Sequence, residues 1–276
     1  MGTIINLFSY DFFTHAFLAS FFAAISCGII GTYIVSRRIV FVSGGITHAS
    51  FGGIGIGYFL GWSPLLGAAI FAVLSGFGIQ LFTQKAKVRE DSSIAIWWSL
   101  GMAIGIIFIY LSPGYAPNLM SYLFGSILTV SITELWLMAA LSLVLILFFA
   151  LFYRLVLYVA FDEEFAKTTG LPVNLINYLL ISLIAITIVL NIRVVGIILI
   201  LSLLTLPQAT ANLFTKDFKK MMLLSILFAF VGAFTGLLVS FYIDIPSGAS
   251  IIFTLVLIFG LIKIAFYFRR KLMVRT

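Results

Sequence analysis

Charged residues are scarce in this chain, and cysteine is nearly absent. Charged side chains make up 9% of the 276 residues, whereas an ordinary soluble domain has about 25%. So few charges cannot cover the surface of a water-soluble fold, which excludes a soluble enzyme or binding module. Cys27 is the only cysteine, and a single thiol excludes a disulfide within the chain and a thiolate metal cluster.

Several catalytic patterns are also absent. The sequence has no Gly-x-x-x-x-Gly-Lys-Ser/Thr phosphate-binding loop, no His-Glu-x-x-His pair and no Gly-x-Ser-x-Gly. A rhomboid-like pair of serine and histidine is left open by residue counts alone. No Asp or Glu lies deep in an apolar run, which argues against a secondary transporter coupled through mid-membrane carboxylates. We therefore predict that the chain is not an enzyme and that any ATP hydrolysis comes from a separate subunit.

Long apolar runs, in contrast, fill the chain. Hydrophobic residues make up 63% of it, and the mean hydropathy is +1.23. A helix needs about 20 apolar residues to cross a bilayer, and these continuous runs differ from the alternating strands of an outer-membrane barrel. We predict an all-α, polytopic transmembrane bundle of about nine spans, with eight as the alternative, in one domain over residues 1–276. The expected spans cover residues 12–35, 40–60, 64–83, 93–112, 134–153, 172–190, 194–213, 220–242 and 248–268.

Lysine and arginine gather in short clusters between these runs. The net charge of +7 would suggest a nucleic-acid partner in a soluble protein, but this distribution fits membrane topology better, and no nucleic-acid partner is expected. If the N-terminus is outside and the chain crosses nine times, 15 of the 16 basic residues fall inside and only Arg193 lies outside. The positive-inside rule therefore predicts an external N-terminus and a cytoplasmic C-terminus.

The second expected span contains a histidine. His48 follows Arg38 by ten residues, or about 15 Å along a helix, which places it near the middle of the membrane. An ionisable residue at that depth is a functional-site hypothesis, and neutral imidazole is a common metal ligand. Gly44 and Gly52 share its helix face and would leave room for an ion or water. The alternative is a buried histidine that bonds a neighbouring carbonyl group.

A short polar segment between the fifth and sixth spans predicts a capped helix on the inner side. Acidic residues open residues 162–170, a glycine closes them, and a proline follows at position 172. Such a helix could bind a soluble partner, and the alternative is an ordinary solvated loop. The candidate partner-binding residues are Asp162, Glu163, Glu164, Phe165, Lys167 and Gly170.

Three further features concern the path of the chain. We expect a tight turn at residues 191–193 and a re-entrant or interfacial helix within residues 118–130. Pro207 lies inside the seventh span, where it would kink the helix. Glycine pairs four residues apart, such as Gly101 and Gly105, predict closely packed helices.

Six segments together resemble the membrane permeases of ATP-binding-cassette importers for zinc, manganese or iron. The segments are residues 43–53, 90–96, 122–128, 162–172, 195–211 and 246–249. Each match is weak alone, but the six occur in the family's order and spacing. The resemblance runs from about residue 37 to the last span.

The resemblance implies a homodimeric permease in the cell membrane, with the metal path along the two-fold axis. It implies a cytosolic ATPase that grips the coupling helix at residues 162–170, and an extracytoplasmic metal-binding protein. It also implies that His48 lines the path, with Ser43 and Thr47 as supporting polar groups and no cofactor beyond the transported ion. Relatives often have an aspartate four residues before this histidine, where this chain has Gly44. A permease for a metal chelate or corrinoid, which is usually longer, and a secondary transporter are the alternatives.

Overall fold

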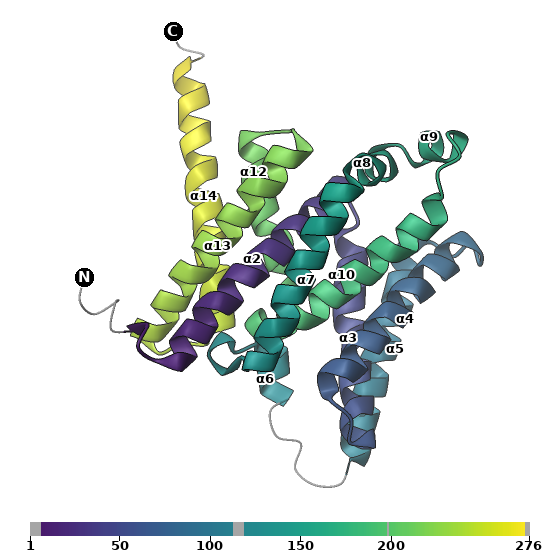
Figure 1. The fold of residues 1–276 in the computed structure, drawn as a ribbon, viewed down its shortest axis with the longest axis horizontal. Helices are drawn as coiled ribbons and strands as arrows, with labels where there is room; N and C mark the ends of the chain where they lie inside the picture. The colour runs from purple at the N-terminus through teal and green to yellow at the C-terminus, as the bar shows by residue number, and fades with distance from the viewer. Residues whose placement is uncertain (1–6, 113–118, 198, 274–276) are drawn as a thin grey trace.

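A computed structural model describes residues 7–112, 119–197 and 199–273, and every element within these ranges is a helix (Figure 1). The elements are α2 (Asp11–Arg37), α3 (Val40–Leu60), α4 (Pro64–Gln84), α5 (Glu90–Leu111), α6 (Leu119–Phe124), η1 (Ile127–Thr129), α7 (Ile132–Leu151), α8 (Tyr153–Phe161), α9 (Glu163–Thr168), α10 (Val173–Val195), α11 (Ile200–Leu203), α12 (Leu206–Phe214), α13 (Phe218–Ile243) and α14 (Ser247–Met273). The all-α prediction is therefore confirmed for the described residues.

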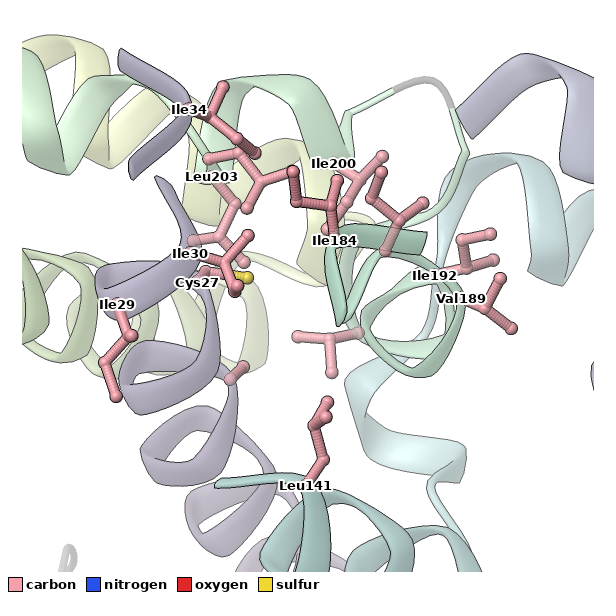
Figure 2. Packing of buried hydrophobic residues seen from close by; sticks show 14 of the residues in the cluster. Cys27, Ile29, Ile30, Ile34, Leu141, Ile184, Val189, Ile192, Ile200 and Leu203 are labelled. Atoms are coloured by element: carbon pink, nitrogen blue, oxygen red, sulfur yellow. The ribbon is translucent and has the colours of Figure 1, made fainter. Parts of the chain in front are cut away.

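Helix α2 lies at the centre of the bundle and contacts α7, α10, α12 and α13. Small residues recur along it, so neighbouring helices can approach its backbone closely. Figure 2 shows Cys27, Ile30 and Ile34 of α2 gathered with Ile184 of α10 and Leu203 of α11 in one apolar cluster, in which each side chain is at most 1% exposed. This cluster holds the two sides of the molecule together.

Two groups of helices flank this centre (Figure 1). Helices α3, α4 and α5 form one group, and α12, α13 and α14 form the other. Glycines allow the close packing within each group. A methyl group built on Gly53 of α3 would overlap the backbone of Gly67 in α4, and one built on Gly236 of α13 would lie 2.5 Å from the Cα atom of Ile251 in α14. The packing role predicted for glycine is confirmed at these contacts.

Seven helices of the described part are long and apolar enough to cross a membrane, namely α2, α4, α5, α7, α10, α13 and α14. Helix α3 has 21 residues, but its glycine-rich and hydroxyl-rich sequence is less apolar. The expected seventh span is divided between α11 and α12, which together cover 200–214. The molecule is thus a polytopic helical bundle, while the count of nine spans stays a prediction.

The turn expected at residues 191–193 is absent, because α10 continues through them to Val195. Asn191 is fully buried, and its Nδ2 atom donates to the Ser26 hydroxyl at 3.0 Å and to the Thr187 carbonyl at 2.8 Å. A polar residue that suggested a turn therefore stabilises a contact between two helices. The chain reverses instead at Gly196, whose φ of 84° suits glycine and whose backbone crosses that of Gly125.

Pro207 does not kink a continuous helix, as the sequence predicted, but lies in the first turn of α12. A proline is favourable there because the first amide groups of a helix have no partner within the helix. The next residue, Gln208, is fully buried, and its Nε2 atom donates to the Cys27 carbonyl at 2.7 Å. Gly31 leaves the space that the Gln208 amide fills. The divided segment is therefore fixed against α2 by a polar contact.

The connections between helices alternate between the two ends of the bundle (Figure 1). Helices α8 and α9 and the connections α2–α3, α4–α5 and α12–α13 lie at one end, where the basic clusters at residues 37–38, 85–89 and 216–220 occur. The start of α2, the α13–α14 connection and α6 lie at the other end. The short helix expected within residues 118–130 is confirmed as α6 and η1. Which end faces the cytoplasm stays a prediction from charge.

Candidate functional site

His48 is the exception in the buried part of α3. Every residue from Val42 to Gly55 is buried apart from His48, whose side chain is partly exposed. It lies on the side of α3 that faces α5. The imidazole is thus only partly buried, and its role in the metal path stays a prediction.

The imidazole ring of His48 stacks on the indole ring of Trp98 in α5. The ring centroids are 4.0 Å apart, and the planes differ by only 4°. This contact depends on the close approach of the two helices, because a methyl group on Gly52 would lie 2.8 Å from the Gly101 carbonyl oxygen. Since Trp98 is itself 38% exposed, the stacked pair lies at the protomer surface.

The two hydroxyl residues predicted beside His48 lie inside the protomer. Ser43 and Thr47 are at most 1% exposed. The Ser43 hydroxyl donates to the Val40 carbonyl at 2.7 Å, and the Thr47 hydroxyl donates to the Ser43 carbonyl at 2.7 Å. Both hydroxyl groups therefore donate to backbone carbonyl groups of α3 itself. The His48 ring, in contrast, is partly exposed. Their role near the metal path stays a prediction.

The free space expected on both sides of His48 is absent at Gly52 and small at Gly44. Gly52 is covered by the Gly101 backbone and by Phe71, whose ring would be 3.1 Å from an added methyl group. At Gly44 an added methyl group would touch the Leu201 side chain at 3.6 Å, an ordinary van der Waals distance. Gly52 therefore allows α3 and α5 to approach closely, whereas the space at Gly44 would also admit a methyl group.

Within the described residues, no group of three or more His, Cys, Asp or Glu side chains could hold a metal ion. His48 is thus not part of such a group within the described residues. A single imidazole cannot bind a metal firmly, because transition-metal sites in proteins use three or four ligands. An ion bound at His48 would therefore need further ligands besides this imidazole.

The short helix predicted at residues 162–170 is present as α9. The Asp162 carboxylate accepts a hydrogen bond from the Phe165 amide at 2.9 Å and so caps its first turn. Gly170, with φ of 75°, ends the segment. Ala166 is buried, whereas Phe165 is 49% exposed. The helix therefore presents an aromatic side chain at the charged end of the bundle, as a docking surface requires.

Glu163 behaves differently from the other acidic residues of this segment. Its carboxylate pairs with Arg37 of α2 at 3.0 Å and with Lys167 at 2.9 Å. Burial pushes the pKa of the Glu163 carboxyl up, but the hydrogen bonds and charges of Lys167 and Arg37 outweigh it and hold the pKa below its ordinary value. Glu163 is therefore ionised at neutral pH and faces α2, whereas Asp162 and Glu164 are exposed.

Two residues of these sites were not found from the sequence. Trp98 follows the segment at residues 90–96, but nothing in the local pattern shows that its ring meets His48. Arg37 was counted only as a topological charge, although it bonds Glu163, 126 residues away. Both contacts join distant parts of the chain, so periodicity and spacing carry no signal for them.

Comparison with known proteins agrees with this architecture. A membrane protein of Synechocystis sp., slr2045, is 40% identical over 249 residues, 90% of this chain and 89% of that protein. The manganese transport system membrane protein MntC of Halalkalibacterium halodurans is 36% identical over 96% of this chain and 90% of its own length. A chain in the structure of PsaBC from Streptococcus pneumoniae in complex with Fab matches with a TM-score of 0.85 and 30% identity, covering 94% of this chain and 93% of that chain.

A family-wide comparison covers nearly all of the described bundle. The model of the ABC 3 transport family matches residues 9–266, a range that includes His48, Trp98 and all of α9. Together with the seven apolar helices, this match places the chain in the cell membrane as a multi-pass protein. The chain therefore belongs to the ABC 3 transport family.

Proposed function

We propose that this chain is the permease subunit of an ABC importer that carries a divalent transition metal ion into the cell. The observation that carries the proposal is the position of His48, the one partly exposed residue between Val42 and Gly55. Imidazole is a ligand for such metals. The family match and the manganese transport protein among the relatives support the same cargo class.

The exposure of His48 has a physical consequence. Ionisable side chains within membrane spans almost always face the bundle interior or a water-filled cavity, because exposure to lipid is costly. In the isolated protomer, the His48–Trp98 pair lies at the surface. A second copy of the chain that covers this surface would enclose the pair. In such a homodimer two imidazole rings, one from each protomer, would line a shared path.

This arrangement suits transport better than storage. Two neutral nitrogen ligands without a carboxylate would bind a divalent ion weakly, with water completing its coordination. Weak binding allows release, which conduction requires as much as entry. The path would therefore pass an ion and hold it only briefly.

Manganese is the first candidate for the cargo, because relatives at 36% and 34% identity are manganese transport proteins. The site chemistry makes zinc and iron the second candidates. Gly44 faces a Leu201 methyl group and provides no carboxylate, and imidazole suits zinc and iron whereas manganese favours oxygen ligands. Uptake of all three metals at equal concentrations separates these choices.

The remaining parts of the importer would be separate proteins. The exposed Phe165 and the capped helix α9 support docking of a cytosolic ABC ATPase at this end of the bundle. An extracytoplasmic metal-binding protein would deliver the ion at the opposite end. The permease itself would then serve as the transport path and not as an enzyme.

Metal uptake by His48→Gln tests the proposal. The amide of glutamine is polar and of similar size, but it is a much weaker metal ligand than imidazole. The variant should lose most uptake at a membrane abundance equal to that of the unchanged protein. His15→Gln in α2 is the matched control, because it makes the same substitution at the only other histidine and should keep full uptake. Full uptake by His48→Gln would contradict the proposed path.

A further inference from the structure

Arg37, in the last turn of α2, joins three helices. Its Nη2 atom lies 3.0 Å from the Glu163 Oε2 atom of α9. Its Nη1 atom donates to the Val159 carbonyl of α8. The rigid fork of a guanidinium group can bind two acceptors at once, which a lysine ammonium on a flexible stem does less well. The end of α2 is thus fixed to both α8 and α9.

Helix α9 has little other attachment to the membrane-spanning helices. Of its six residues only Ala166 is buried. Among the side-chain hydrogen bonds found in the described residues, the one from Arg37 to Glu163 alone joins α9 to such a helix. Both side chains are largely covered, with 21% of Arg37 and 24% of Glu163 exposed. This ion pair is therefore a direct side-chain connection from α9 to α2.

A cavity of about 220 Å³ lies beside the pair. Arg37 and Glu163 line it together with Tyr33, Gln80 and Asn177. Asn177 is only 5% exposed, and the Gln80 Oε1 atom is buried without a partner. A cavity of this volume, with these polar groups in its lining, has room for several water molecules. Both members of the ion pair therefore line a space that can hold water.

The ion pair is also next to the start of the helix that carries His48. Helix α2 ends at Arg37, Arg38 follows with φ of 60°, and α3 begins at Val40. His48 lies eight residues further on, or about 12 Å along the helix. A displacement of Arg37 would therefore act on the turn that sets the position of α3.

We propose that the Arg37–Glu163 ion pair is the mechanical link that carries movement of α9 to the α2–α3 turn and so to the helix of His48. This inference rests on the proposed function, in which an ATPase docks on α9 and His48 lines the path. Arg37 is a positioning residue in this scheme, since it touches neither the ATPase nor the metal. Glu163 binds inward to Arg37, while the exposed Phe165 faces the partner.

The test measures the metal imported per ATP hydrolysed by the complete transporter in lipid vesicles. Arg37→Gln should still copurify with the ATPase and allow ATP hydrolysis, while the metal imported per ATP falls at least about fivefold, the lower end of typical coupling between sites. Arg37→Lys should retain an intermediate ratio. The double variant Arg37→Gln/Glu163→Gln should import no less metal per ATP than the more impaired single variant, because both changes break the same ion pair.

Arg38→Gln is the matched control, since it removes the same charge from an exposed neighbouring residue and should leave the ratio unchanged. If Arg37→Gln is not inserted into membranes, Glu163→Gln tests the link from its other side. If the tested variant imports as much metal per ATP as the unchanged protein, the inference is wrong. It is also wrong if ATPase copurification falls in parallel with transport, because the change would then act on docking. A failure of the unchanged protein to import metal would instead contradict the proposed function.

Discussion

His48 and Trp98 stack face to face, 4.0 Å apart and within 4° of parallel, although they belong to different helices. An indole face attracts positive charge. If the imidazole binds a divalent ion as proposed, it would become part of a cationic group, and the indole beneath it would stabilise that state. The stack also restricts rotation of the imidazole ring. Trp98 therefore has both an electrostatic and a positioning relationship with the proposed ligand.

The first prediction concerns this stack. Trp98→Leu removes the aromatic face and should reduce metal uptake severalfold, because a cation over an aromatic ring gains about 0.5–2 kcal/mol. Trp98→Phe keeps a smaller aromatic face, so its metal uptake should lie between that of Trp98→Leu and that of the unchanged protein. Initial uptake rates over a series of metal concentrations provide the measurement. Equal uptake by the leucine variant and the unchanged protein would show that the indole only fills space.

The second prediction concerns helix packing. Gly53→Ala places a methyl group against the Gly67 backbone, and α3 and α4 must then separate. Overpacking of this kind costs about 1–3 kcal/mol, so the melting temperature of the purified permease should fall. Gly260→Ala in α14 is the matched control, because nothing lies within 4 Å of its added methyl group. That change should be neutral or slightly stabilising, since alanine favours helices.

The third prediction concerns topology. We expect single cysteines at Ser63, Lys87 and Lys271, in a background that carries Cys27→Ala, to report the two sides of the membrane. All three positions are exposed. An impermeant thiol reagent added to intact cells should label the cysteine at position 63 and leave those at positions 87 and 271 unlabelled. Labelling at position 87 or 271 under these conditions would reverse the orientation inferred from the basic clusters.

The sequence predicted most of the fold because apolar runs and their breaks follow from bilayer thickness and backbone chemistry. It failed at residues 191–193, where polar character was read as a turn, and at Pro207, which begins α12 and does not kink a continuous span. Asn191 instead donates two hydrogen bonds inside the bundle, and Gly196 makes the actual reversal. Periodicity cannot distinguish a polar residue in a turn from one that joins two buried helices.

The candidate site was predictable only in part, for a similar reason. His48 stood out because an ionisable residue is rare in a span, and α9 stood out through its capping pattern. The sequence could not show that His48 faces outward from a single protomer or that Trp98 covers it. It also could not show that Glu163 bonds Arg37, because that contact depends on the tertiary fold.

The fourth prediction concerns α9 and distinguishes docking from coupling. Phe165 is 49% exposed, and its ring lies 5.9 Å from that of Tyr158, so the two aromatic residues present an apolar surface beside the acidic start of the helix. Phe165→Asp should abolish ATPase copurification and metal uptake together, because a charge opposes burial at an apolar interface. Phe165→Leu keeps an apolar side chain and should retain most of both. Pull-down of the ATPase from membranes, with uptake measured in the same cells, checks the outcome.

Unchanged copurification and uptake in Phe165→Asp would refute the docking role. The contrast with Arg37→Gln is informative, because that variant should keep the ATPase bound and lose only the link to transport.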